Sequence, residues 1–155
     1  MKNIIKVTVL TAVVALSTTS MFAATAQGTI AVTATVAKNC TVTNGTLDFG
    51  AYDPIVANAT VPKNDTAPAS ISVSCTKGTS ATVTLATTTP LTNGTDTLAF
   101  ALFSDAGHSV AFAAPVLSFA AGKAAQAVSV YGQIAAGQDV STGSYNGVVT
   151  ATITY

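Results

Sequence analysis

The sequence predicts an all-β fold, specifically an antiparallel β-sandwich, and three observations lead to this prediction. Short segments alternate apolar and polar residues with a period of two, as half-buried strands do. Turn signals such as Asn93-Gly94 and Asp105-Ala-Gly107 separate these segments. No segment of helical length has convincing apolar spacing at 3.6 residues. About seven short strands, spaced by turns after a first separate strand, are the pattern of a sandwich.

The N-terminus predicts a secretory signal peptide over residues 1–26. Lys2 and Lys6 supply a short positive region, residues 7–16 form the apolar stretch, and residues 24–26 read Ala-Thr-Ala, a small-x-small cleavage site. The apolar stretch is too short for a membrane-spanning helix, which needs about 20 residues. We therefore expect export, a mature chain that begins at Gln27, and no transmembrane segment after cleavage.

The first strand is predicted over residues 29–37, directly behind the cleavage site. Its apolar side chains share one face, and Thr29, Thr33 and Thr35 share the other; the apolar residues are Ile30, Val32, Ala34 and Val36. The segment precedes Cys40, so it lies outside the covalent loop that a Cys40–Cys75 bond would close. At the other end of the chain, residues 145–155 alternate in the same way, and no later strand follows. We expect assembly by strand exchange from these two features.

The strands between these two ends follow in order along the chain. Residues 51–69 hold three of the five prolines and are predicted to form a loop or edge crossing. Leu98, Phe100 and Leu102 alternate within a segment whose two faces are both fairly apolar. The expected strands cover residues 41–49, 71–75, 83–85, 98–103, 110–112 and 128–131.

Composition excludes several classes of partner. The chain has no Arg, Glu or Trp, and four lysines face six aspartates after residue 26. A surface this poor in cations is a bad match for a phosphate backbone, so no nucleic-acid partner is expected. Cys40 and Cys75 are an even pair in an exported chain, which predicts a disulfide.

Residue types that act in catalysis or bind metals are few in this chain, so no enzyme, metal site or cofactor is expected. His108 is the single histidine, and one histidine without a free cysteine cannot build a zinc site with three protein ligands. We expect His108, Ser104 and Asp105 to form a turn with solvated side chains. The aspartates are scattered, and no spacing singles out a carboxylate pair for glycoside hydrolysis.

Several motifs, in order along the chain, resemble the spore coat protein U domain family, which includes pilin subunits of archaic chaperone–usher pili. The similarity covers essentially all of the mature chain. The loop after Asp105 departs from the family pattern because it lacks the Arg and Trp of many relatives. The matching segments are Lys38-Asn-Cys40, Leu47-Asp-Phe49-Gly-Ala-Tyr52, Ile71-Ser-Val-Ser-Cys75, Leu98-Ala-Phe-Ala-Leu-Phe-Ser-Asp105, Val130-Tyr-Gly-Gln-Ile-Ala-Ala-Gly137, Gly143-Ser-Tyr145 and Val149-Thr-Ala-Thr-Ile-Thr-Tyr155.

The resemblance implies an incomplete immunoglobulin-like antiparallel β-sandwich that lacks its last strand. Residues 27–39 would be an N-terminal donor strand, with Ile30, Val32, Ala34 and Val36 as its inserting side chains, and residues 40–155 would be the pilin domain. Cys40 and Cys75 would form the disulfide. The acceptor cleft and chaperone contact would involve Val149, Ala151, Ile153 and Tyr155.

The same resemblance implies a function and partners. The chain would be a structural pilus subunit, exported through the periplasm to the cell surface, that supports attachment and biofilm formation. A periplasmic chaperone and an outer-membrane usher would hand it to identical or related subunits in a head-to-tail fibre. Two alternatives remain open: a spore or cell coat protein of the same domain family, and a minor or adhesive pilin that binds a surface ligand.

Overall fold

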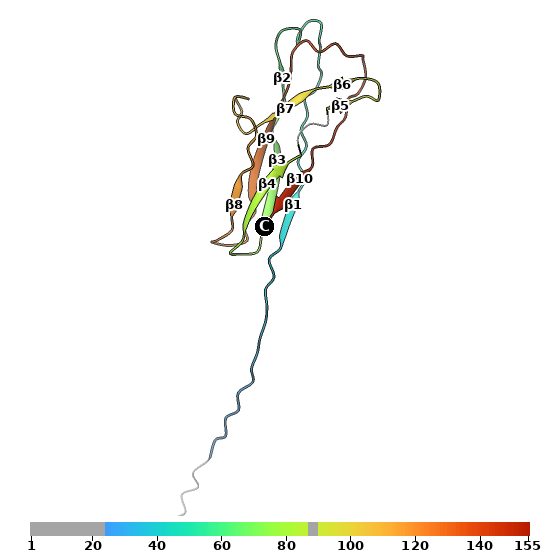
Figure 1. Cartoon of the computed structure of the whole chain (residues 1–155). Helices are drawn as coiled ribbons and strands as arrows, with labels where there is room; N and C mark the ends of the chain where they lie inside the picture. The colour runs from blue at the N-terminus through green and yellow to red at the C-terminus, as the bar shows by residue number, and fades with distance from the viewer. Residues whose placement is uncertain (1–23, 87–89) are drawn as a thin grey trace, which may run out of the picture. The chain divides into compact units, whose positions relative to one another are not determined.

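The computed structural model describes residues 24–86 and 90–155, and these residues contain ten β-strands and no helix (Figure 1). The charged and apolar regions of the predicted signal peptide lie outside the described residues. None of the described residues forms a helix that could span a membrane. The strands are β1 (Cys40–Thr43), β2 (Lys63–Asn64), β3 (Ala69–Cys75), β4 (Ser80–Leu85), β5 (Leu91–Thr92), β6 (Thr97–Leu98), β7 (Phe100–Phe103), β8 (Val116–Ser118), β9 (Gln126–Ile134) and β10 (Ala151–Thr154).

The chain divides into two units, residues 1–34 and residues 35–155. The described part of the first unit, residues 24–34, forms no strand and is exposed throughout. Among residues 24–86 and 90–155, no strand is assigned to the predicted segment 29–37 and no neighbouring strand pairs with it. All ten strands belong to the second unit.

The strands form three antiparallel sheets. The largest has the order β1-β3-β9-β2, and β7 also pairs with β9. The second has the order β10-β4-β8, and β5 pairs with β6 in a small hairpin. In the registers, Ile71 lies opposite Val128, and Val83 lies opposite Ile153. These registers put apolar residues of neighbouring strands on the same face.

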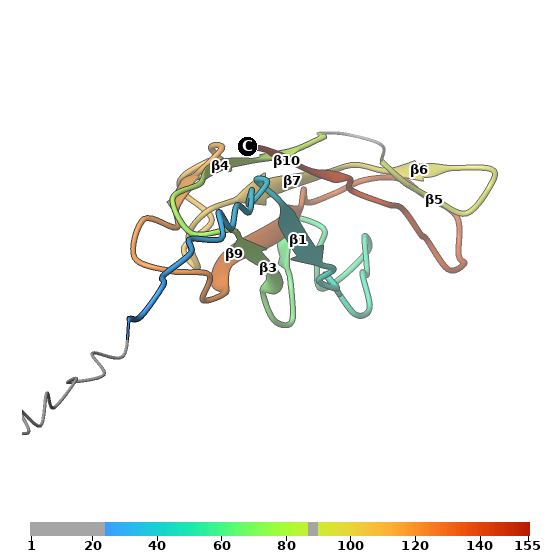
Figure 2. The ribbon, with the colours of Figure 1, turned by 90° about the horizontal axis from the view of Figure 1, so that it is seen from below.

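The inner faces of the two larger sheets share one core. Alternate residues of β3 and β9 are buried, as the period-2 pattern predicts. Val73 of β3, Val83 of β4 and Phe119 are completely or almost completely buried and belong to one cluster. Figure 2 shows β4 and β10 above β1, β3 and β9. A second cluster around Phe49, Leu98 and Ile134 packs the end of the domain that holds β5 and β6.

Several expected strands differ in extent from the observed ones. The predicted strand at 98–103 is split between β6 and β7, and the predicted strand at 110–112 is reduced to a single bridge between Phe103 and Ala111. A strand not predicted from the sequence, β8, begins directly after Pro115. It forms because β4 has an edge there that is not paired with β10. The three residues of β8 pair with Ser80, Ala81 and Thr82 of β4.

Candidate functional site

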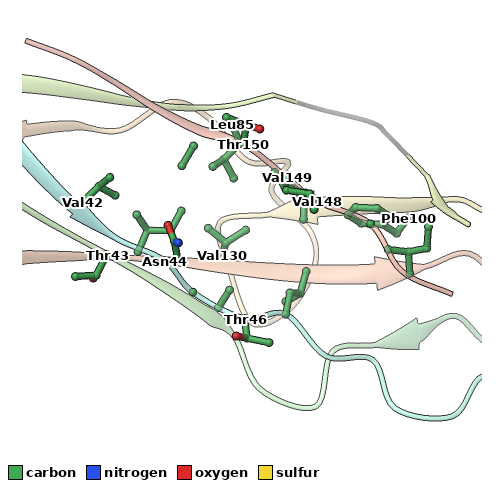
Figure 3. Close-up of a pocket in the computed structure, with 18 of the residues that line it drawn as sticks. Val42, Thr43, Asn44, Thr46, Leu85, Phe100, Val130, Val148, Val149 and Thr150 are labelled. Carbon is green, nitrogen blue, oxygen red and sulfur yellow. The ribbon is translucent and has the colours of Figure 1, made fainter. Parts of the chain in front are cut away.

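An apolar groove runs between the edges of the two larger sheets (Figure 3). Its volume is about 510 Å³, and none of its lining residues is charged. Figure 3 shows Val42 and Thr43 on one side, Leu85 and Thr150 on the other, and Val130 between them. The lining residues are Val42, Thr43, Asn44, Gly45, Thr46, Leu47, Phe49, Ala69, Ile71, Leu85, Leu91, Phe100, Leu102, Val130, Gly147, Val148, Val149, Thr150 and Ala151.

Two edge strands border this groove. β1 pairs with β3 on one side, and β10 pairs with β4 on one side; the described residues place no further strand next to either. An edge strand carries backbone N–H and C=O groups that can pair with another segment of chain. The groove therefore combines an apolar floor with two borders able to form a hydrogen-bonded ladder.

The groove floor comes from the strands that build the core. Ile71 of β3, Val130 of β9 and Leu102 of β7 contribute side chains to it, and Phe100 lies toward the β5–β6 end. Ile71 and Val130 also belong to the main core cluster. The groove is thus a continuation of the core that is left open, rather than a separate polar site.

Two glycines allow the border segments to approach their neighbours closely. A Cβ at Gly45 would lie 2.7 Å from the backbone oxygen of Ser70, and a Cβ at Gly147 would lie 2.9 Å from Leu91 Cδ2. Both positions follow an asparagine in the sequence, at Asn44 and Asn146. These two Asn-Gly pairs are the sequence feature that could have pointed to the borders of the groove. By themselves they indicate only turns.

The structure brings two of the four predicted acceptor residues into the groove. Val149 and Ala151 line it. Ile153 packs against the main core cluster instead, and Tyr155 is 51% exposed. The residues that sequence reasoning missed are those of the floor and the β1 border, because strands distant in the chain contribute them.

The predicted donor side chains lie outside any core. Ile30, Val32 and Val36 are 89%, 87% and 81% exposed, and Ala34 is exposed as well. Burying each of these three large aliphatic side chains against a partner would contribute roughly 1.5–3 kcal/mol.

The disulfide holds one border of the groove in place. Cys40 and Cys75 are bonded, with an S–S distance of 2.02 Å, and they lie opposite each other in the β1–β3 register. Beyond them, Asn39 N–H donates to Thr76 Oγ1 at 3.1 Å, and Thr76 N–H donates to the Asn39 carbonyl at 2.9 Å. The first residues of the domain are therefore fixed to the β3–β4 turn.

The expectation of a solvated turn around His108 is wrong for the histidine itself. His108 Nε2 lies 2.8 Å from Asp65 Oδ1, and both side chains are almost completely buried. The ring stands edge-on to Phe103 and Tyr131. The turn folds the ring inward because His108 adopts a φ of 51°. In residues 24–86 and 90–155, no group of three potential metal ligands occurs, so this pair has no third ligand.

Comparisons with known proteins agree on the family. The family model described as the Spore Coat Protein U domain matches residues 26–152. The chain is also 33% identical to Protein U from Myxococcus xanthus, in an alignment that covers 86% of this chain and 87% of that protein. The chain belongs to the Spore Coat Protein U domain family.

Proposed function

We propose that this protein is a structural subunit of an extracellular assembly, in which residues 27–39 of one copy fill the groove of the next. The observation that carries this proposal is the open apolar groove between two edge strands, β1 and β10. The domain is then an incomplete immunoglobulin-like sandwich, and the strand of a neighbour completes it. Such a head-to-tail contact does not close on itself, so it produces a chain of subunits.

The dimensions of the donor and the groove support the fit. The apolar face from Ile30 to Val36 extends for about 20 Å at 3.4 Å per residue. The border formed by residues 147–154 has eight residues and extends for about 24 Å. The apolar face therefore spans most of this border, and the whole of residues 27–39, about 41 Å when extended, is longer than the border.

The chemistry of the two faces also matches. Ile30, Val32, Ala34 and Val36 would enter the apolar groove, while the threonines of the opposite face would remain in water. Each large aliphatic side chain contributes roughly 1.5–3 kcal/mol on burial, and the backbone ladder to β1 and β10 adds to this. The lack of charged residues in the groove avoids the cost of desolvating an ion.

A groove of this kind needs a temporary guest before assembly. We propose that a periplasmic chaperone covers it by lending a strand, and that an outer-membrane usher exchanges that strand for the neighbour's segment. Val149 and Ala151 would contact either guest, and the exposed Tyr155 would be a further contact for the chaperone. The Cys40–Cys75 disulfide supports an oxidising compartment, as expected for an exported protein.

A surface coat is the first candidate for the assembly. The description of the matching family favours this reading. A chaperone–usher pilus is the second candidate, and the exposed alternating segment before Cys40 favours it. Electron microscopy with an antibody against the protein separates the two, because a coat gives a continuous layer and a pilus gives thin filaments.

The proposal is tested by placing one charge on either face of the donor segment. In the full-length protein, Val32→Asp puts a carboxylate into the apolar groove, whereas Thr33→Asp puts it on the face that stays in water. We expect Val32→Asp to abolish surface assemblies and Thr33→Asp to leave them. Deletion of residues 27–37 should have the effect of Val32→Asp. Normal assemblies from the deletion variant would refute strand donation.

A further inference from the structure

Three of the four lysines of the domain, Lys38, Lys77 and Lys123, lie together at one end of it. Lys77 and Lys123 line a hollow beside the disulfide, together with Asn39, Thr41, Ser74 and Thr76. Lys38 stands at its rim, since the neighbouring Ala37 carbonyl accepts a hydrogen bond from Thr76 Oγ1 at 3.3 Å. All three lysines are exposed. Tyr155 follows β10 at this end.

The opposite end carries carboxylates. Asp53, Asp96 and Asp139 lie in loops that hydrogen bonds join together: Tyr52 Oη accepts from Gln138 N–H at 2.9 Å, and Asp96 Oδ2 accepts from Ser141 N–H at 2.8 Å. The loop after Asp53 is tied to the same group, because Gly137 N–H donates to the Asn58 carbonyl. Lys63 is the one lysine on a strand next to these loops, so the carboxylates outnumber it.

The length of β9 gives the distance between the lysine hollow and the acidic loops. Lys123 precedes β9, and the loop with Asp139 follows it. The nine residues of β9 extend for roughly 27 Å. Figure 1 likewise shows β2, β5 and β6 at the end of the domain away from β1 and β8. The lysine hollow and the acidic loops therefore do not neutralise each other within one copy, because salt screens charges this far apart.

Two of these carboxylates, those of Asp53 and Asp96, have lowered pKa values. Backbone N–H groups of Val56 and Ile55 donate to Asp53 and hold its pKa below the usual aspartate value. Hydrogen bonds from the side chain and backbone of Ser141 lower the pKa of Asp96 in the same way.

We propose that the lysine hollow is an interface for the acidic loops of the neighbouring copy, so that charge sets the polarity of the assembly. The inference rests on the proposed strand donation. Residues 37–39 connect Val36 of the donor face to Cys40 over four Cα–Cα steps, which reach at most about 14 Å, so the hollow lies against the copy that receives the strand. If the strand leaves the groove at the acidic loops, lysines meet carboxylates. If it leaves at the other end, three lysines meet three lysines and repel each other.

Zero-length cross-linking with a carbodiimide tests this contact on the protein as it assembles. Full-length protein labelled with nitrogen-15 is mixed with unlabelled protein before assembly, so that mass spectrometry identifies links between copies. We expect mixed-isotope links from Lys77 or Lys123 to Asp96 or Asp139. Assembled protein in which mixed-isotope links join none of these residues would overturn the proposal.

Charge reversal gives a second, independent readout. The double variant Lys77→Glu/Lys123→Glu should assemble about tenfold more slowly than the unmodified chain at low salt, and the difference should shrink as salt is added. Lys63→Glu reverses one charge beside the acidic loops instead of in the hollow, so it should not slow assembly. Mixing the double variant with Asp139→Lys copies should restore part of the rate.

The outcomes separate this inference from the proposed function. If deletion of residues 27–37 stops assembly but the double variant assembles at the unmodified rate, strand donation stands and the charged interface is wrong. If the deletion variant assembles normally, strand donation itself fails, and this inference fails with it.

Discussion

The imidazole of His108 and the carboxylate of Asp65 form a buried pair, with Nε2 and Oδ1 2.8 Å apart. The same carboxylate oxygen accepts the backbone N–H of Gly132 at 3.0 Å. Asp65 thereby connects the turn that holds His108 to the second half of β9. His108 Nδ1 is buried without a hydrogen-bond partner, so the carboxylate is the only hydrogen-bonding contact that the described residues give this ring.

Replacing Asp65 should destabilise the domain strongly. Asp65→Ala leaves His108 Nε2 and the Gly132 N–H buried without a partner, and each buried polar group left unsatisfied costs about 1–3 kcal/mol. We expect a loss of that size in the free energy of unfolding, measured by urea denaturation followed by circular dichroism.

A double-mutant cycle identifies the source of the effect. Asp65→Ala and His108→Ala should be strongly non-additive, because each variant removes the same interaction. Asp48→Ala is a suitable control, since Asp48 is an exposed aspartate on a neighbouring segment. Additive losses in the cycle would show that the pair does not couple the two segments.

The sequence predicted the strands whose own side chains alternate, and it failed where pairing depends on distant partners. β3, β4 and β9 were expected because their buried residues recur at every second position. β8 was missed because its three residues show little pattern and are ordered by the free edge of β4.

The candidate site was predictable on one border. Val149 and Ala151 could be named because they alternate within the predicted strand over 145–155, of which the structure assigns Ala151–Thr154 to β10. The floor residues Ile71, Leu102 and Val130 come from three strands, and sequence spacing gives no sign that they meet. The Asp65–His108 pair could not be predicted for the same reason, because its two residues are 43 positions apart in the sequence.

The disulfide should contribute substantially to stability. Its two cysteines are 35 residues apart, and closing a loop of that length in the unfolded chain is worth about 3–4 kcal/mol. Replacing both cysteines with alanine should lower the free energy of unfolding by this amount in urea denaturation. A reducing agent should reproduce the loss in the unmodified protein and have no effect on the variant. An unfolding curve that reduction leaves unchanged would contradict this account.

The turn after Asp105 should loosen in acid. Hydrogen bonds from the backbone N–H of Val110 and from the hydroxyl of Ser109 lower the pKa of Asp105 below its ordinary value of 3.8. A lowered pKa means that the carboxylate stabilises the fold above 3.8, and that this contribution is lost as pH falls through the folded value.

Nuclear magnetic resonance measures this transition directly. The amide signals of Ser109 and Val110 should shift with pH, with a midpoint below 3.8. In Asp105→Asn, the amides of Ser109 and Val110 should no longer titrate, because the asparagine side chain does not ionise. A midpoint at or above 3.8 in the unmodified protein would show that these hydrogen bonds do not favour the ionised carboxylate.

Gly132 should not tolerate a side chain. A Cβ at this position in β9 would lie 2.6 Å from Leu47 Cδ2 and 2.7 Å from Phe49 Cζ, and Phe49 is buried and cannot swing away freely. Overpacking of this kind costs about 1–3 kcal/mol, so Gly132→Ala should lower the free energy of unfolding by that amount. Ser129→Ala is the matched control, because Ser129 is exposed on the same strand.

Since Leu47 and Phe49 also line the groove, Gly132→Ala should weaken assembly as well, whereas Ser129→Ala should leave it unchanged. Unchanged unfolding of Gly132→Ala would mean that Leu47 and Phe49 can move aside at little cost, and that the groove is less rigid than its packing indicates.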